Sequence, residues 1–232
     1  MNSQASVITV DGPSGVGKGT LCQWLAMRLG WRLLDSGALY RLTALAALRR
    51  NLALQDETKV AAVAAELNVE FIPDVGGAVQ AILDGAEISD ALLRSETTGN
   101  AASQVAALPT VRAALLQRQR NFRQAPGLIA DGRDMGTVVF PDADLKLFLT
   151  ASADERADRR YKQLIEKGMD ANLAVLIKEI AERDARDAQR TVAPLKPAVD
   201  AEILDTTQLD IAEVCAWALA LVNQRLRIRV IP

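Results

Sequence analysis

The chain of 232 residues has no histidine and only two cysteines, Cys22 and Cys215. Without histidine, a Ser-His-Asp or Cys-His nucleophilic site, a histidine-ligated metal and acid–base catalysis by histidine are excluded. The two cysteines are far apart in the sequence and outside any CxxC pattern, which argues against a disulfide framework and a cysteine-built zinc site. We therefore expect a reducing cytosol as the compartment and no metal ion ligated by the protein alone.

The sequence also lacks a dominant charge and a long hydrophobic run. Lys and Arg total 27 and Asp and Glu total 29, a formal net charge of −2, which argues against a basic nucleic-acid-binding protein and an acidic disordered chain. The most apolar helical stretch, Ile211 to Val222, is too short to span a bilayer, and residues 1–6 do not resemble a secretory signal. We expect a cytoplasmic protein that binds neither a membrane nor a nucleic acid polymer and, since no heptad pattern is present, a monomer.

Short apolar runs alternate along the chain with longer segments of helical period. Val7-Ile8-Thr9-Val10 is the first such run, and leucines then recur at four-residue intervals over residues 21–29. The patterns predict strands at 7–10, 31–34, 128–131, 144–150 and 202–204, and helices at 18–29, 38–50, 57–67, 111–122 with Thr110 as its N-cap, 153–167, 173–190 and 211–222. Three short runs joined by turns predict a small antiparallel insertion at about 68–89. The alternation is typical of an α/β three-layer fold with a central parallel sheet of about five strands.

A glycine-rich segment, GPSGVGKGT, follows the first predicted strand and opens the first predicted helix. Glycines let successive N–H groups point at one anion, the helix N-terminus adds partial positive charge, and the lysine supplies a mobile ammonium for the outer phosphates. In the Walker A pattern GxxxxGK[ST] a hydroxyl residue follows the lysine, whereas here Gly19 intervenes before Thr20. We predict a P-loop for ATP phosphates made of Gly12, Pro13, Ser14, Gly15, Val16, Gly17, Lys18, Gly19 and Thr20.

A phosphate loop alone leaves two classes open, a switch GTPase and a small-molecule kinase. The guanine-reading NKxD motif does not occur in the sequence. Further charged motifs, suited to an acceptor substrate, are present elsewhere in the chain, and they favour the kinase.

Those motifs are DSGALYR at 35–41, NAASQVA at 100–106, DGRDMGTVVFP at 131–141 and ERDARDAQR at 182–190. Together with the phosphate loop they closely resemble the bacterial cytidylate kinases, within the nucleoside-monophosphate kinases, over nearly the whole chain. The resemblance implies ATP-dependent phosphorylation of CMP and dCMP by in-line transfer, in pyrimidine nucleotide metabolism, with Mg²⁺ held mainly through nucleotide phosphates and water. It also implies one domain, with a core at 1–36, 104–152 and 191–232, a monophosphate-binding subdomain at 37–103 and a short helical lid at about 153–190.

The resemblance assigns catalytic roles to four charged residues. Lys18 bridges toward the γ-phosphoryl group, and Arg190 reaches the phosphates. Arg133 grips the acceptor phosphate, since a guanidinium can donate two hydrogen bonds at once. Asp131 orients magnesium-bound water.

The same resemblance assigns the acceptor site. Ser103, Arg112 and Asp134 match positions that read the cytosine edge, while Arg183 and Asp187 match positions that hold the sugar hydroxyls. The full set expected to bind the acceptor is Ser36, Arg41, Ser103, Arg112, Arg133, Asp134, Arg183, Asp187 and Arg190. In this set Arg41 holds the acceptor phosphate, and Ser36 contacts that phosphate or orients Arg41.

Several of these residues also have a purely structural interpretation. Arg41 and Arg190 could be solvated helix arginines, and Arg183 with Asp187, at i and i+4, could be a helix salt bridge worth a few tenths of a kcal/mol. Arg159 and Arg160 fit lid arginines and surface arginines equally well.

Overall fold

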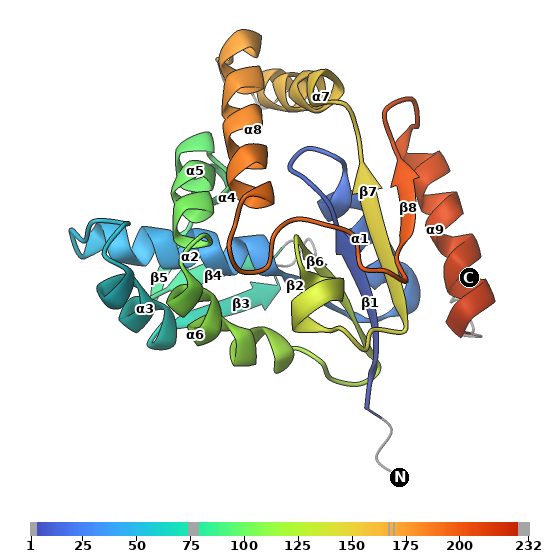
Figure 1. Cartoon of the computed structure of the whole chain (residues 1–232), viewed down its shortest axis with the longest axis horizontal. Helices are drawn as coiled ribbons and strands as arrows, with labels where there is room; N and C mark the ends of the chain where they lie inside the picture. Colours follow the sequence, from blue (N-terminus) through green and yellow to red (C-terminus); the bar gives the residue numbers. More distant parts are fainter. Residues whose placement is uncertain (1–3, 74–78, 167, 169, 227–232) are drawn as a thin grey trace. The chain divides into compact units, whose positions relative to one another are not determined.

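The computed structural model describes residues 4–73, 79–166, 168 and 170–226. The chain divides into two compact units (Figure 1), one formed by residues 1–35 and 119–232 and the other by residues 36–118. Each unit has its own hydrophobic core.

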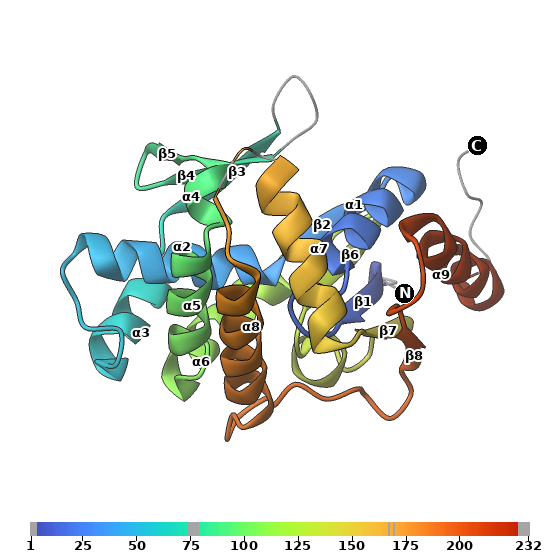
Figure 2. The same ribbon diagram turned by 90° about the horizontal axis from the view of Figure 1, so that it is seen from above.

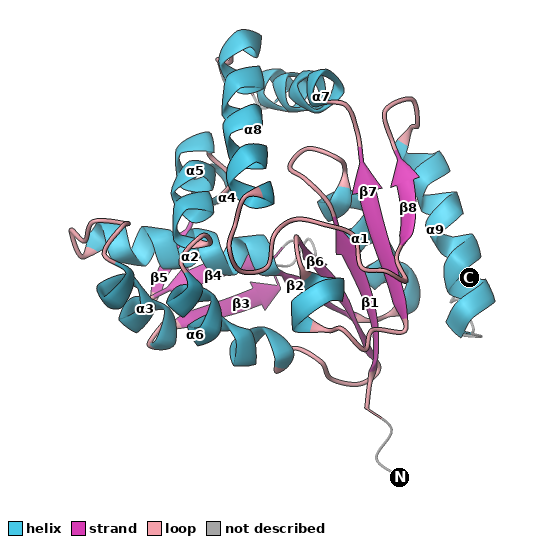
Figure 3. Cartoon of the chain, in the orientation of Figure 1, coloured by secondary structure: helices cyan, strands magenta, loops and turns pink. Residues whose placement is uncertain are grey.

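A parallel sheet forms the centre of the first unit (Figure 3). Its five strands are β1 (Ser6–Asp11), β2 (Arg32–Asp35), β6 (Gly127–Gly132), β7 (Leu145–Thr150) and β8 (Glu202–Asp205), in the order β2-β6-β1-β7-β8. Asp11 pairs with Gly132, and Asp35 pairs with Asp131, so the carboxyl ends of β1, β2 and β6 meet at one edge. In open parallel sheets, ligands bind at this edge.

The two faces of this sheet are covered by different elements. Ile8 and Val10 of β1 share a core with side chains of α1 (Lys18–Leu29) and α9 (Ile211–Leu226), two helices that lie beside each other (Figure 2). Thr9 and Asp11 point to the opposite face, because side chains alternate along a strand. There they meet η1 (Met135–Val139), a short π-helix packed on β1 and β6. The first unit is therefore built of three layers.

Two further helices, α7 (Ala153–Glu166) and α8 (Leu173–Ala188), pack against each other in the first unit. Asn172 caps α8, accepting a hydrogen bond from the Val175 amide at 3.2 Å. No helix in the described part of the chain combines the length and the apolar character needed to cross a membrane.

The second unit combines helices with a small antiparallel sheet. Its helices are α2 (Ser36–Arg49), α3 (Glu57–Ala65), α4 (Asp90–Leu93), α5 (Glu96–Val105) and α6 (Pro109–Arg120, whose last two residues belong to the first unit), and its sheet has the order β3-β4-β5, with β3 (Val69–Pro73), β4 (Val79–Leu83) and β5 (Ala86–Ile88). Leu42 and Leu45 of α2 and Val105 of α5 pack in its core with Leu83 of β4. The turn predicted between β3 and β4 falls largely at 74–78, outside the described residues.

This architecture confirms the predicted α/β three-layer fold with a five-stranded parallel sheet and an antiparallel insertion. The predicted cap of α6 was wrong: the helix already begins at Pro109, a residue favoured in the first turn of a helix. Thr110 instead donates to Glu57 through its amide at 3.0 Å and its hydroxyl at 2.9 Å. The π-helix η1 was not predicted.

Candidate active site

The phosphate loop joins the end of β1 to the start of α1. Gly12 has a φ of +147°, and a Cβ there would lie 2.2 Å from the carbonyl oxygen of Leu149, so this position requires glycine. Gly17 begins α1 in a left-handed conformation, and within the described chain its N-cap position has no side-chain hydrogen bond. The first N–H groups of α1 are thus directed into the loop without a capping side chain, which suits an anion.

Lys18 is buried beneath this loop. The residue is only 6 % exposed, and its side-chain ammonium donates a hydrogen bond to the Pro13 carbonyl at 2.8 Å. Burial, followed by the charge of Arg133, lowers the pKa of Lys18 to about 8, while Asp131 acts in the opposite direction. Burial thus disfavours the charged form of Lys18, and an arriving polyphosphate stabilises that form.

We expect ATP binding to take up protons at alkaline pH. At pH 8.5 a lysine with a pKa of about 8 is mostly neutral, and bound phosphate raises its pKa, so about half a proton or more is drawn from the buffer. At pH 7 the lysine is already charged, and uptake is small. Calorimetric titration in two buffers of different ionisation enthalpy measures this uptake. Lys18→Met is the control, and equal uptake in the variant contradicts the assignment to Lys18.

Asp131 lies at the C-terminal end of β6, close to the start of α1. One of its carboxylate oxygens would be 3.7 Å from a Cβ placed on Gly19. Asp131 thus stands beside the position where the usual pattern has a hydroxyl residue, and its charge acts on Lys18. Among the described residues, no group of three or more cysteine or acidic side chains is placed to hold a metal ion.

Three predicted site residues form one ion-pair cluster. Asp187 accepts from Arg133 Nε at 2.9 Å through one oxygen and from Arg190 Nη2 through the other. Burial alone would raise the pKa of Asp187, but the charges of Arg133 and Arg190 outweigh it and hold that pKa below its usual range. The Nε of Arg190 is buried and has no hydrogen-bond partner in the described structure. A buried donor of this kind is costly unless a ligand satisfies it, and a phosphate oxygen is a suitable acceptor.

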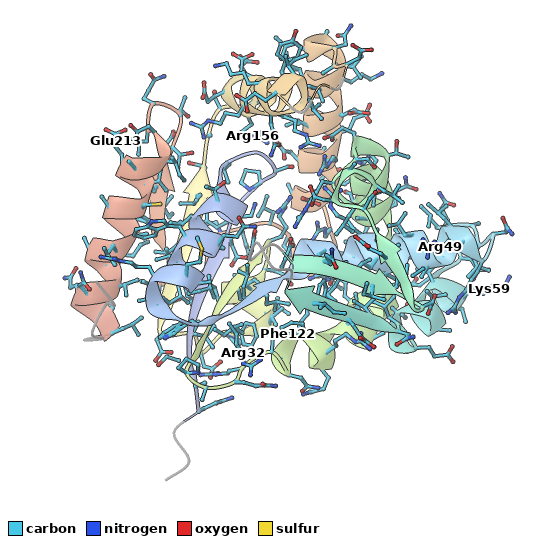
Figure 4. The ribbon with its side chains drawn as sticks, turned by 180° about the vertical axis from the view of Figure 1, so that it is seen from behind. Arg32, Arg49, Lys59, Phe122, Arg156 and Glu213 are labelled. Atoms are coloured by element: carbon cyan, nitrogen blue, oxygen red, sulfur yellow. The ribbon has the colours of Figure 1, made fainter. Side chains whose placement is uncertain are left out.

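Helix α8 and helix α7 both contact the phosphate loop. Arg183 of α8 donates to the Ser14 hydroxyl at 3.3 Å. Arg156 of α7 (labelled in Figure 4) donates to the Ser14 carbonyl at 3.0 Å and binds both carboxylate oxygens of Asp184, at 3.2 and 2.5 Å. These bonds hold the loop from two sides, through its backbone and through a side chain.

The predicted lid arginines have other contacts. Arg159 donates to the Thr206 carbonyl at 2.5 Å and to Glu155 at 2.8 Å, joining α7 to the segment after β8. Arg160 donates to Gln163 at 2.6 Å on an exposed part of α7. The arginine of α7 that touches the phosphate loop is Arg156, which the sequence pattern did not single out from its neighbours.

Asp134 and Asp11 lie on the η1 face of the sheet. Asp134 is 2 % exposed at the N-cap of η1. Asp11 accepts from the first two amides of η1, and burial raises its pKa to about 7, with the charge of Asp134 adding to the increase. Sequence reasoning assigned no role to Asp11, although its place at the end of β1, directly before the glycine of the phosphate loop, was a usable signal.

The remaining predicted residues belong to the second unit. Ser36 is buried at the start of α2, and Arg41, further along that helix, donates to the carbonyls of Leu93 and Ser95 at 2.8 and 3.1 Å. Ser103 is buried on α5. Arg112 of α6 is buried, donates to the Ala106 carbonyl at 3.2 Å and lies 5.6 Å from the ring centre of Tyr40. Arg41 of α2 and Arg112 of α6 are thus held in place by contacts within this unit.

Comparison with known proteins gives a consistent family match. The family model described as Cytidylate kinase matches residues 8–224. A cytidylate kinase from Pseudomonas putida is 62% identical over 215 residues, covering 92% of this chain and 94% of that protein. Cytidylate kinases from Aeromonas hydrophila and Shewanella loihica are 58% and 56% identical over 226 residues, covering 97% of this chain and 97% and 98% of those proteins.

Proposed function

Because the chain belongs to the cytidylate kinase family, we propose that it transfers the γ-phosphoryl group of ATP to CMP and dCMP, giving CDP and dCDP. The transfer is direct and in-line, and it serves pyrimidine nucleotide metabolism. The observation that carries the proposal is the cluster of Arg133, Asp187 and Arg190, with its unsatisfied buried donor, in the same unit as the phosphate loop and Lys18.

The chain's residues supply positioning and charge neutralisation for this reaction. An oxygen of the CMP phosphate attacks the γ-phosphorus, and the bond from that phosphorus to the bridging oxygen of ADP breaks. The transition state has charge spread over the phosphoryl oxygens, so donors fixed around it lower the barrier. The amides at the start of α1 hold the phosphates of ATP, and Lys18 bridges toward the γ-phosphoryl group. Arg133 and Arg190 bind the phosphate oxygens.

Magnesium fits this site through the nucleotide. Mg²⁺ usually keeps several waters and is bound by one or two carboxylates together with substrate phosphates. We propose that Asp131, next to Gly19 at the start of α1, would orient a metal-bound water, while the phosphates of ATP would supply direct ligands. When bound, the ion neutralises charge on the β- and γ-phosphates.

Asp187 is compatible with two roles in the acceptor site. Its two oxygens accept from Arg133 and Arg190, and an ionised carboxylate has about four lone-pair positions. A sugar hydroxyl can therefore add to this cluster without displacing either arginine. We propose that Arg183 and Asp187 hold the sugar hydroxyls of the acceptor, with Asp187 also fixing the two phosphate-binding guanidinium groups.

We propose that Asp134, Arg112 and Ser103 bind the cytosine base. Arg41 binds the acceptor phosphate together with Arg133, and Ser36 contacts that phosphate or orients Arg41. Residues 37–103, which lie within the compact unit 36–118, then serve as the monophosphate-binding subdomain of one kinase domain, and the region at about 153–190, with α7 and α8, serves as the lid. We propose that the enzyme acts as a cytoplasmic monomer on small-molecule substrates, without a nucleic acid polymer or a membrane. The net charge of −2 supports the absence of a nucleic acid polymer among the partners.

The test is transfer of label from [γ-³²P]ATP in the presence of Mg²⁺ and CMP. We expect label in the β-phosphate of CDP, with ADP and CDP formed in equal amounts. Slow release of labelled inorganic phosphate that does not depend on CMP would favour a switch-type nucleotide hydrolase instead.

A further inference from the structure

Asp11 holds the start of η1 from a neighbouring strand. Its Oδ1 accepts from the Met135 amide and its Oδ2 accepts from the Gly136 amide, both at 2.8 Å. Asp11 is only 4 % exposed, so both bonds are shielded from water. In its ionised form, which predominates above a pH of about 7 because burial raises the pKa of Asp11 to about 7, the carboxylate makes charge-assisted hydrogen bonds to both amides. Such bonds are about twice as strong as neutral ones.

This contact replaces a local cap. The first amides of a helix have no partner within the helix and are usually satisfied by the residue at the N-cap. At the N-cap of η1 stands Asp134, for which the described structure gives no capping side-chain bond. The cap comes instead from Asp11, which is distant in sequence and belongs to the central strand of the sheet.

Close packing fixes the same segment against β1. A Cβ added to Gly136 would lie 2.9 Å from Thr9 Oγ1, so the backbone of η1 approaches the strand more closely than a side chain permits. Arg133 and Asp134 directly precede the two amides held by Asp11. A shift of the Met135 and Gly136 backbone therefore changes the position from which both side chains project.

We propose that Asp11 is a positioning residue: its carboxylate sets the backbone at the start of η1 and thereby aims Arg133 and Asp134 at the acceptor. The inference rests on the proposed function, since it concerns the acceptor site of that reaction. It concerns the acceptor rather than the donor, because both oxygens of Asp11 bond to amides of η1, directly after Arg133 and Asp134.

Asp11→Asn tests this with little change of shape. The amide side chain has one acceptor oxygen, and its nitrogen faces a backbone N–H, donor against donor, so one of the two bonds is lost. Displacement of a binding group by about 1 Å can cost up to about a hundredfold. We expect the KM for CMP to rise about ten- to a hundredfold, while the KM for ATP stays within about threefold.

Asp144→Asn is the matched control. Asp144 also accepts from a backbone amide of the β1 region, Val7 N at 2.8 Å, but at the opposite end of the strand. Asp144 is exposed and accepts this single bond, which the asparagine oxygen can keep, so the variant controls for removing a carboxylate charge beside β1, and we expect it to change neither KM. The amide proton shifts of Met135 and Gly136 provide a reading independent of turnover, and they should move upfield in Asp11→Asn alone. Asp11→Ser, with a shorter side chain, replaces Asp11→Asn should the latter not fold.

The outcomes separate the inference from the proposed function. A wild-type protein that does not phosphorylate CMP overturns the proposed function, and the amide shifts then still test the cap itself. If the wild type is active, an unchanged KM for CMP in the Asp11 variant overturns the positioning role. Equal increases of both KM values, or equal effects in the Asp144 control, also overturn it, since they indicate general damage to the fold.

Discussion

Lys18→Ala will lower kcat about a hundred- to a thousandfold while leaving the dissociation constant of CMP within about threefold. The reason is that, in the proposed reaction, Lys18 of the phosphate loop meets charge that develops on the transferred group, so its contribution is made in the transition state. Its burial beneath the loop makes each electrostatic contact stronger than it would be in water. Steady-state kinetics give kcat, and calorimetry gives the dissociation constant of CMP.

Two further variants make this measurement specific. Lys18→Met keeps most of the volume of the buried side chain while removing the charge, so it separates loss of the ammonium from collapse of the loop. Lys59→Ala removes an exposed lysine of the second unit, whose side chain is 65% accessible and paired with Asp56, and it should leave kcat unchanged. A kcat near that of the wild type in Lys18→Met would overturn the phosphate-loop assignment.

Asp134→Ala will reduce the preference for CMP over UMP. A carboxylate accepts from the N4 amine of cytosine, whereas uracil presents the acceptor O4 at that place, so the charge both attracts one base and rejects the other. An unpaired buried group costs roughly 1–3 kcal/mol, which corresponds to about ten- to a hundredfold in kcat/KM for each mismatched contact. Because Asp134 is almost fully buried, we expect the full effect: kcat/KM falls for CMP and is largely unchanged for UMP.

The competing interpretation gives Asp134 only a local structural role beside Arg133 and η1. It predicts that both substrates lose activity equally, so that the ratio of their kcat/KM values stays constant. Asp134→Asn adds a second test: its amide can accept from the cytosine amine or donate to uracil O4, so the CMP to UMP ratio should fall because kcat/KM for UMP rises.

Local patterns were sufficient to predict the sheet and the phosphate loop. The apolar run at 7–10 forms a buried strand, and the glycines after it form a tight turn. Both depend on the local sequence alone, so a short stretch of it predicts them. The structure extends β1 to Asp11 and begins α1 at Lys18, in agreement with the predicted strand and helix. The same holds for the antiparallel insertion, whose strands alternate with turn residues.

The polar contacts of the site could not be predicted in this way, because they join residues distant in sequence. Asp187 was open to interpretation as a helix salt bridge with Arg183, and the structure pairs it with Arg133, 54 residues away, and with Arg190. The π-helix η1 depends on amide acceptors supplied by Asp11, 124 and 125 residues earlier. Arg156 resembles Arg159 and Arg160 in sequence, and only the fold distinguishes it by placing it against Ser14.

The central claim is that this chain is a kinase that selects CMP or dCMP as the phosphoryl acceptor. The most direct measurement is kcat/KM for ADP release in a coupled assay with Mg²⁺ and ATP, across CMP, dCMP, UMP, AMP and GMP. We predict high values for CMP and dCMP, values for UMP lower by at least about tenfold, and still lower values for the purine monophosphates. Equal or higher values for UMP or AMP, or ADP release that does not depend on any monophosphate, would contradict the account.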